Sequence, residues 1–254
     1  MSDLGIVFYR GPSLLTGDPI VGVITGLDKG SANTKTGAIA QAWVLRADLA
    51  PQAAKRLNLD DAVCGDCQLR GLNGHDSKCY VPGFVPGIVY RHLDDYPDAS
   101  WPDLHAVMEG RMVRLCAYGD VAAIAFEVWE QVLKTASSWI GYSHAWRHID
   151  PRFKRLVMAS VDTEDEFIIA SLSGWRTFRI RMPGAPLIAG AEFPCPASDE
   201  MGHRTTCAEC RLCRGTSSPA RSVAIVAHGK PSSLRAFGIK VPFFVSRGAA
   251  EIAV

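Results

Sequence analysis

Residues 112–138 read MVRLCAYGDVAAIAFEVWEQVLKTASS. The first seven residues are mostly apolar and end at Gly119, which is typical of a buried β-strand. From Val121 onward the apolar residues recur at helical spacing, and Asp120 stands where it can cap a helix. This stretch therefore predicts one strand followed by one helix.

The same order of elements recurs along the chain. We expect strands at 20–25, 41–46, 139–144, 155–161, 175–182 and 222–229, and helices at 51–59, 86–95, 101–109 and 163–174. Strands joined by helices or long loops pair in parallel, because a crossover needs that length. The fold class that we predict is α/β, a partial or complete parallel β/α barrel with Cys-rich metal-binding loops. We expect a single β/α domain over residues 1–254.

Composition narrows the class of protein. The chain has 254 residues, of which 48% are hydrophobic, as in ordinary globular proteins. With 27 basic and 26 acidic residues, the chain lacks the basic excess of most nucleic-acid binders. The net charge does not exclude a local basic patch that binds nucleic acid. No apolar run has the ~18 residues of a membrane span, and the start MSDLGIVFYRGPSLL lacks the pattern of a secretory signal. We expect a soluble cytoplasmic protein with no membrane partner.

Seven of the eight cysteines fall into two groups, which we call the three-Cys group and the four-Cys group. The three-Cys group is Cys64, Cys67 and Cys79, in the loop 64–80; the four-Cys group is Cys195, Cys207, Cys210 and Cys213, in the loop 195–213. Close spacing in a reducing compartment indicates metal binding or redox chemistry more than disulfides. Cys116 lies in an apolar strand, so we interpret it as a buried thiol outside both groups.

The four-Cys group follows the pattern C-P-x10-C-x2-C-x2-C. Four thiolates in this arrangement suit the four corners of a [4Fe–4S] cluster. Zinc also accepts four thiolates, but a third consecutive C-x2-C thiolate has no role in its usual two-knuckle sites. A redox or structural thiol cluster is the remaining alternative.

The three-Cys group, C-x2-C-x11-C, supplies only three thiolates. A cluster held by three ligands keeps one iron open to a substrate or cofactor. The alternative is a zinc site completed by His75 or by a ligand from elsewhere in the chain. Because seven thiolates exceed the four corners of one cluster, we expect two separate clusters.

Polar residues follow several predicted strands, and parallel strands direct such residues to one face. We predict a catalytic set there, with proton transfer as the role of the histidine: Tyr118, His144, Arg147 and Asp162. The alternatives are helix caps for Asp120 and Asp162, a hydrogen-bonded rim position for His144, and solvated strand ends for Arg147, Arg179 and Arg181.

The loop GLDKGSANTKTG at 26–37 lacks the phosphate-binding pattern G-x4-G-K-[ST]. Asn33, Lys35 and Thr36 can still present a charge and hydrogen bonds to an anionic ligand, the alternative being a polar surface loop. Asn33, Lys35 and Asp120 are our candidate cofactor-binding residues. His228, which ends the last predicted strand, is a further candidate.

Several short segments carry a resemblance. They are SANTKTG at 31–37, VCGDC, KCYV, VRLCAYGD, GYSHAW, MASVD, GWRTFR, CPAS and TTCAECRLC. Between about residue 18 and residue 215 the chain resembles an uncharacterised family of Cys-rich proteins carried by bacterial phages and mobile elements. The Cys pattern and β/α order also resemble the radical S-adenosylmethionine enzymes, which use a partial β/α barrel and a three-Cys [4Fe–4S] cluster. Their typical C-x3-C-x2-C spacing is absent here, although S-adenosylmethionine remains a candidate cofactor.

Three functions from different classes follow from these patterns. The first is a [4Fe–4S] redox or radical enzyme acting on a small molecule or nucleotide. The second is a non-enzymatic zinc protein that binds nucleic acid or protein, with phosphate contacts from RHIDPRFKR at 147–155 and RLCRGTSSPAR at 211–221. The third is a redox-sensing regulator whose partner interface changes when the cluster is lost.

Overall fold

The computed structural model describes residues 5–28, 33–71, 77–81, 84–228 and 231–238. The strands are β1 (Gly5–Pro12), β2 (Pro19–Thr25), β3 (Ala40–Arg46), β4 (Met112–Tyr118), β5 (Ser138–Ser143), β6 (Met158–Val161), β7 (Thr177–Arg181), β8 (Glu192–Pro194) and β9 (Ser222–Val226). The α-helices are α1 (Pro51–Arg56), α2 (Asp61–Cys64), α3 (Phe84–Arg91), α4 (Trp101–Met108), α5 (Phe126–Leu133), α6 (Glu164–Leu172), α7 (Cys207–Cys210) and α8 (Pro231–Ala236). Short 3-10 helices are η1 (Leu93–Asp95), η2 (Val121–Ala123), η3 (Pro151–Arg155), η4 (Asp199–Met201) and η5 (Gly215–Ser217).

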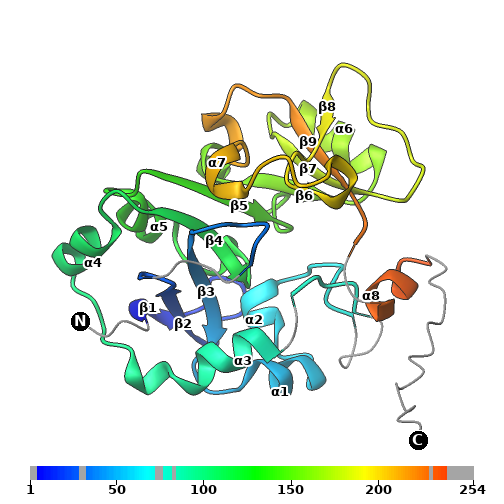
Figure 1. Ribbon diagram of the computed structural model, residues 1–254. Coiled ribbons are helices and arrows are strands. Elements are labelled where there is room, and N and C mark those ends of the chain that lie inside the picture. The colour runs from blue at the N-terminus through cyan, green and yellow to red at the C-terminus, as the bar shows by residue number, and fades with distance from the viewer. Residues whose placement is uncertain (1–4, 29–32, 72–76, 82–83, 229–230, 239–254) are drawn as a thin grey trace, which may run out of the picture.

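The described strands form one sheet in the order β1-β2-β3-β4-β5-β6-β7-β9-β8 (Figure 1). From β3 to β8 every neighbouring pair is parallel, which confirms the mixed α/β class and the predicted parallel pairing. β1, β2 and β3 pair antiparallel, because the short link between β1 and β2 cannot form a crossover. The sheet ends at two edges, β1 and β8, so it is not closed, and the complete-barrel alternative is wrong.

The two faces of the parallel strands carry different residues, because successive side chains point to opposite sides. In β4, Val113 and Leu115 belong to the main hydrophobic core with residues of α4, α5 and α6. Their neighbours Arg114 and Cys116 point the other way, toward a cavity. Helices α4, α5 and α6 thus cover one face of the sheet, and the opposite face borders the cavity.

Strand β4 is irregular at Cys116. Gln41 of β3 pairs with Arg114, but Trp43, two residues later, pairs with Tyr118, four residues later. Cys116 has a φ of 54°, a left-handed conformation that is rare outside glycine. A bulge of this kind bends a strand and redirects its side chains. It therefore changes how the last residues of β4 are presented to the cavity.

Two predicted elements begin later than expected. The helix after β4 starts at Phe126, because Asp120 caps the short η2 instead, where its side chain accepts a hydrogen bond from the Ala122 amide. Residues 155–157 precede β6, which starts at Met158 after η3. Both differences are at element ends, where local sequence patterns are least informative.

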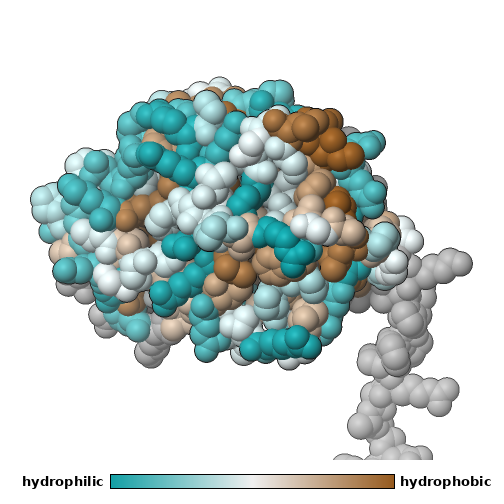
Figure 2. Space-filling view, turned by 90° about the horizontal axis from the view of Figure 1, so that it is seen from above, coloured by the Kyte–Doolittle hydropathy of each residue, from teal (hydrophilic) through white to brown (hydrophobic). Residues whose placement is uncertain are grey.

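The side of the molecule seen from above is mainly hydrophilic, with a hydrophobic patch toward its upper right edge and smaller hydrophobic areas nearer the centre (Figure 2). Within the described ranges, no helix is long and apolar enough to cross a lipid bilayer.

Candidate functional site

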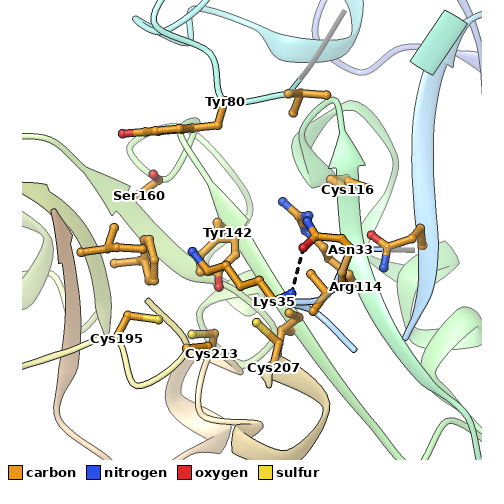
Figure 3. Close-up of a pocket in the computed structure, with 18 of the residues that line it drawn as sticks. Asn33, Lys35, Tyr80, Arg114, Cys116, Tyr142, Ser160, Cys195, Cys207 and Cys213 are labelled. Atoms are coloured by element: carbon orange, nitrogen blue, oxygen red, sulfur yellow. Dashed lines mark hydrogen bonds between the residues drawn. The ribbon is translucent and has the colours of Figure 1, made fainter. Parts of the chain in front are cut away.

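A cavity of about 820 Å³ lies between the Cys-rich loops and the face of the sheet opposite α4, α5 and α6 (Figure 3). Its floor is made by alternate residues of the parallel strands. These are Gln41 and Trp43 of β3, Arg114, Cys116 and Tyr118 of β4, Ile140 and Tyr142 of β5, Ser160 of β6, Phe178 and Ile180 of β7, and Val223 and Ile225 of β9. The volume is within the range of small-molecule sites in proteins.

All four cysteines of the four-Cys group line this cavity, and Cys195, Cys207 and Cys210 are close enough to Cys213 to interact with it electrostatically. Helix α7 begins at Cys207 and ends at Cys210, and a capping box between Thr206 and Glu209 fixes its start. The next residue, Arg211, has a left-handed conformation that turns the chain toward Cys213. A short helix and one sharp turn thus present three cysteines from a single loop.

The loop at 33–37 holds α7 in place. The Cys207 and Ala208 amides donate hydrogen bonds to the carbonyls of Lys35 and Thr36, each at 3.0 Å. Gly37 has a φ of 72°, and a Cβ there would lie 3.2 Å from atoms of Thr206 and Ala208. A glycine is required both for this conformation and for the close approach.

The four thiols interact electrostatically. Burial raises the pKa of Cys213 to about 12; the Tyr142 hydroxyl, which is hydrogen-bonded to this sulfur, opposes the rise, and Cys195, Cys207 and Cys210 add to it. Burial also raises the pKa of Cys195 and of Cys207, and Lys35 partly offsets both shifts. In the metal-free chain the thiols of Cys195, Cys207 and Cys213 therefore stay protonated at neutral pH.

In the three-Cys group, Cys67 and Cys79 are close enough to Cys64 to interact with it electrostatically. Cys64 ends α2, and the Cys67 amide donates a hydrogen bond to the Cys64 carbonyl. Burial, and then the neighbouring Cys67 and Cys79, raise the pKa of Cys64 well above its usual range. Burial raises the pKa of Cys67 to about 12. His75, the alternative zinc ligand in this segment, is outside the described residues.

Asp120 connects the three-Cys segment to the end of β5. Its amide donates a 2.7 Å hydrogen bond to the carbonyl of Val63, the residue before Cys64. One oxygen of its buried carboxylate accepts hydrogen bonds from the Ala122 amide and the Ser143 hydroxyl, and the other accepts one from the His144 amide. These contacts give Asp120, our candidate cofactor-binding residue, a role in positioning the backbone, as the cap alternative predicts.

His144 and Asp162 border a second, small cavity of about 30 Å³, together with Cys67 and Arg147. The His144 Nε2 and Asp162 Oδ1 atoms are buried, and neither has a hydrogen-bond partner among the described residues. Burial raises the pKa of Asp162, and the nearby His144 partly offsets this. Buried polar atoms almost always have a partner in folded proteins, and a cavity of this size holds one water molecule or a ligand atom.

The other two members of the predicted catalytic set differ in their surroundings. The Arg147 guanidinium donates a 2.7 Å hydrogen bond to Glu166 and stacks over the Trp146 ring. Tyr118 lines the large cavity, and burial, followed by the nearby Cys64, raises its pKa well above the usual range. Thr163 caps α6, so the cap alternative for Asp162 is not what the structure shows.

The loop residues Asn33 and Thr36 bond within their own turn. The Asn33 side chain accepts a hydrogen bond from the Lys35 amide, and the Thr36 hydroxyl donates to the Asn33 carbonyl. Lys35 Nζ lies 3.4 Å from Nε2 of His228, whose Nδ1 bonds the Val226 carbonyl. Because a carbonyl only accepts, Nδ1 carries the proton and Nε2 faces the ammonium group.

Arg179 and Arg181 bind carboxylates of the chain itself. The Arg179 guanidinium donates two hydrogen bonds to Glu192, at 2.8 and 2.7 Å, and Arg181 pairs with Glu200. These pairs tie β7 to β8 and to the loop that precedes the four-Cys helix. Both arginines are therefore structural, and neither is a solvated strand end.

A sequence analysis that considers only the ends of strands does not identify four residues of the cavity, Tyr80, Arg114, Cys116 and Tyr142. The signal for Arg114 is present, since it is a charged residue inside an apolar run and two positions before Cys116. Tyr142 likewise stands two positions before His144. Period-two spacing back from each strand end would have identified them.

Among the described residues, no group of three or more His, Cys, Asp or Glu side chains is placed to hold a metal ion. The metal assignment therefore stays a prediction from ligand chemistry. No protein-family model, no curated protein and no solved structure matches this chain. The site itself is thus the basis for any statement about function.

Proposed function

We propose that the two Cys groups hold two [4Fe–4S] clusters, and that the protein is a redox or radical enzyme acting on a small molecule or nucleotide bound in the large cavity. The observation that carries this proposal is the placement of the four-Cys group. Four cysteines separated by up to 18 positions in the sequence all line one ligand-sized cavity. Such a cavity is the default location of a substrate.

The residues around the four-Cys group fit a cluster chemically. All four ligands are sulfur, the soft donor that iron–sulfur clusters use. Binding replaces the thiol protons and concentrates negative charge, which Lys35 and Arg114 would stabilise, since both lower the pKa of Cys207. The Tyr142 hydroxyl, bonded to Cys213, is the kind of donor that tunes a cluster's potential. A [4Fe–4S] cluster supplies one-electron transfer.

The three-Cys group fits an open coordination position. It offers three thiols, and beside Cys67 lie the two buried polar atoms, His144 Nε2 and Asp162 Oδ1, that have no partner among the described residues. A bound ligand would satisfy both atoms. In this proposal His144 and Asp162 orient the ligand and move a proton. Tyr118 lines the large cavity near Cys64. Arg147 positions Glu166 and through it the amide of Asp162.

The arrangement supports the resemblance to radical S-adenosylmethionine enzymes. The three-Cys segment follows β3, the first strand of the parallel series, and the sheet is open. We propose that this sheet is a partial barrel and that S-adenosylmethionine is a candidate ligand of the open position. We also propose that the chain belongs with the Cys-rich phage and mobile-element proteins, and that it works in the reducing cytoplasm.

The zinc alternative with a nucleic-acid partner gains no support from the basic segment 147–155. Arg147 pairs with Glu166, Arg152 with Asp150 and Glu127, and Arg155 with Glu130. Arginines that are neutralised in this way make weak phosphate anchors. No observation favours this second function over the first.

Anaerobic purification followed by metal analysis and an absorbance spectrum tests the proposal. We expect metal analysis to find iron and acid-labile sulfide, and we expect the absorbance spectrum to show a broad charge-transfer band in the visible range. A chain that carries zinc, or no metal after anaerobic reconstitution with iron and sulfide, would contradict the proposal.

The open position has its own test. We expect the electron paramagnetic resonance spectrum of the reduced protein to change on addition of S-adenosylmethionine or of cyanide, a small iron ligand. The His144→Ala variant should weaken that response. If cyanide produces no change in wild-type protein with full iron content, the three-Cys centre has no open position.

A further inference from the structure

Two cations of the large cavity, Lys35 and Arg114, have neither a carboxylate nor a carbonyl partner among the described residues, whereas a third, Arg211, donates a hydrogen bond to the Ala208 carbonyl. The Arg114 guanidinium, on β4, makes no hydrogen bond or ion pair with any described residue. Lys35 Nζ contacts only the neutral Nε2 of His228, at 3.4 Å. Most other arginines beside the strand ends are paired, as Arg147, Arg179 and Arg181 show.

The acidic residues of the cavity wall do not balance these cations. Asp120 is already engaged by three hydrogen-bond donors of the protein. Asp199 is 2.6 Å from His203. The cavity lining therefore carries a net positive charge near Arg114 and Lys35. Holding these two charges partly away from water without a partner costs free energy.

The two cations approach the same part of the cavity. Figure 3 shows Lys35 and Arg114 extending into the space between the cysteines of the four-Cys group and Tyr80. Both lower the pKa of Cys207, so both are near that sulfur. A forked guanidinium and an ammonium group at one end of a cavity are typical of oxyanion binding.

Much of the remaining cavity lining is apolar or aromatic. The rings of Tyr142 and Phe178 lie 4.6 Å apart on the sheet, and Tyr80 stacks on His228 at 4.8 Å. Ile140 and Ile180 add an aliphatic floor. Flat, apolar groups bind between surfaces of this kind.

We propose that the large cavity binds a small molecule with a planar apolar body and one oxyanion, a phosphate or a carboxylate, and that Arg114 and Lys35 hold the oxyanion. This inference rests on the proposed function in taking the cavity as the substrate site, and it names the chemical class of that substrate. Arg114 is a binding residue in this account, in addition to the residues at the strand ends.

Isothermal titration calorimetry on the anaerobically purified full chain at fixed ionic strength tests the inference. Two matched pairs of probes separate the possible oxyanions: AMP against adenosine, and benzoate against benzyl alcohol. We expect the anion of at least one pair to bind about tenfold tighter than its neutral partner, because charge-assisted hydrogen bonds are the stronger kind. Discrimination in the first pair indicates a phosphate, and in the second a carboxylate.

Two variants assign the effect to the named residues. Arg114→Gln and Lys35→Gln should each reduce the discrimination to about threefold or less, since each removes one cation. Arg91→Gln, which removes an exposed charge from α3, should leave it unchanged. Should a variant fail to fold, the wild-type comparison still decides, since equal binding of anion and neutral partner in both pairs overturns the inference.

The outcomes separate this inference from the proposed function. Full iron content without discrimination in either pair refutes the oxyanion site and leaves the iron–sulfur proposal standing. Discrimination by a chain that holds no iron supports the oxyanion site and counts against the clusters. A change in the cluster's reduction potential in Arg114→Gln, with unchanged discrimination, would show that Arg114 serves the thiolates alone and would also overturn the inference.

Discussion

Asp120→Asn tests how the ends of β4 and β5 are held beside the three-Cys group. One oxygen of Asp120 accepts bonds from the Ala122 amide at 3.0 Å and the Ser143 hydroxyl at 2.7 Å, and the other accepts one from the His144 amide at 2.8 Å. An asparagine has one acceptor oxygen, so in either orientation its NH₂ group faces a backbone N–H. The Ser143 hydroxyl can rotate to accept, but a backbone amide cannot.

The magnitude follows from these contacts. One buried amide loses its acceptor, which costs about 1–3 kcal/mol, and the remaining bonds lose their charge assistance. We expect a total loss of about 2–4 kcal/mol in the free energy of unfolding. For a chain of this size that is a decrease of about 5–15 °C in Tm. Urea unfolding followed by tryptophan fluorescence measures it, and iron content reports whether the three-Cys group is retained.

Asp150→Asn is the matched control. Asp150 also begins a 3-10 helix and accepts a bond from the amide two residues later, at 2.9 Å, but its side chain is 34% exposed. Water can replace the lost acceptor there, and the pair of Asp150 with Arg152 is exposed and contributes little, so we expect a change of less than about 1 kcal/mol. Equal stability of Asp120→Asn and wild type would refute the reasoning, because relief from burying the Asp120 charge would then offset the lost bonds.

Three further predictions concern other parts of the fold. Glu192→Gln should lower the free energy of unfolding by about 3–5 kcal/mol, because it leaves the buried Arg179 charge without its carboxylate partner. Asp98→Asn, which breaks the exposed pair with Arg10, should cost under about 1 kcal/mol. Similar urea midpoints for the two variants would contradict this prediction. Gly215→Ala should prevent folding, because the added Cβ would lie 2.1 Å from the Lys154 carbonyl oxygen. The control Gly184→Ala, at a φ of 81° with open space around it, should lower the free energy of unfolding by only about 1–2 kcal/mol, measured by thermal unfolding. A folded Gly215→Ala variant with a near-normal Tm would be inconsistent with this packing. Burial raises the pKa of Glu166, but hydrogen bonds from the Asp162 amide and Arg147 outweigh burial, so the pKa in the folded chain is lowered from 4.5. The contribution of Glu166 to stability is therefore present above pH 4.5 and is lost as the pH falls through the lowered pKa of the folded chain. Glu166→Gln should flatten this acid branch of the stability–pH curve, and an unchanged slope would count against the Arg147–Glu166 pair.

The parallel strands could be predicted because their signal is local. The run at 112–118 matches β4 to the residue, and 139–144 and 175–182 contain most of β5 and β7. Apolar runs of this length carry their strand signal in a few adjacent residues. The open sheet could not be predicted in the same way, because the three-residue β8 depends on β9, a partner that is distant in sequence. The other edge strand, β1, pairs with the neighbouring β2, so its signal is local.

Some features of the candidate site can likewise be predicted from local sequence, and others depend on tertiary contacts. The spacing of Cys207, Cys210 and Cys213 is a local property and indicates one ligand loop, but helix α7 and its turn depend on the Thr206–Glu209 capping box and the left-handed Arg211, which the Cys pattern does not predict. Which neighbour takes up each charged side chain is a tertiary property, so the pairing of Arg179 with Glu192 and the unpaired state of Arg114 among the described residues become visible only in the fold. The bulge at Cys116 likewise depends on the pairing of β4 with β3.

The iron content per chain of three proteins tests the central claim most directly: wild type, Cys64→Ala and Cys210→Ala, each reconstituted anaerobically and assayed for iron, sulfide and folded state by circular dichroism. Two clusters require about eight iron atoms per wild-type chain, and each variant should lose about four while keeping the spectrum of the other cluster. A wild-type content near four atoms that persists with full spectral intensity in Cys64→Ala would contradict the account.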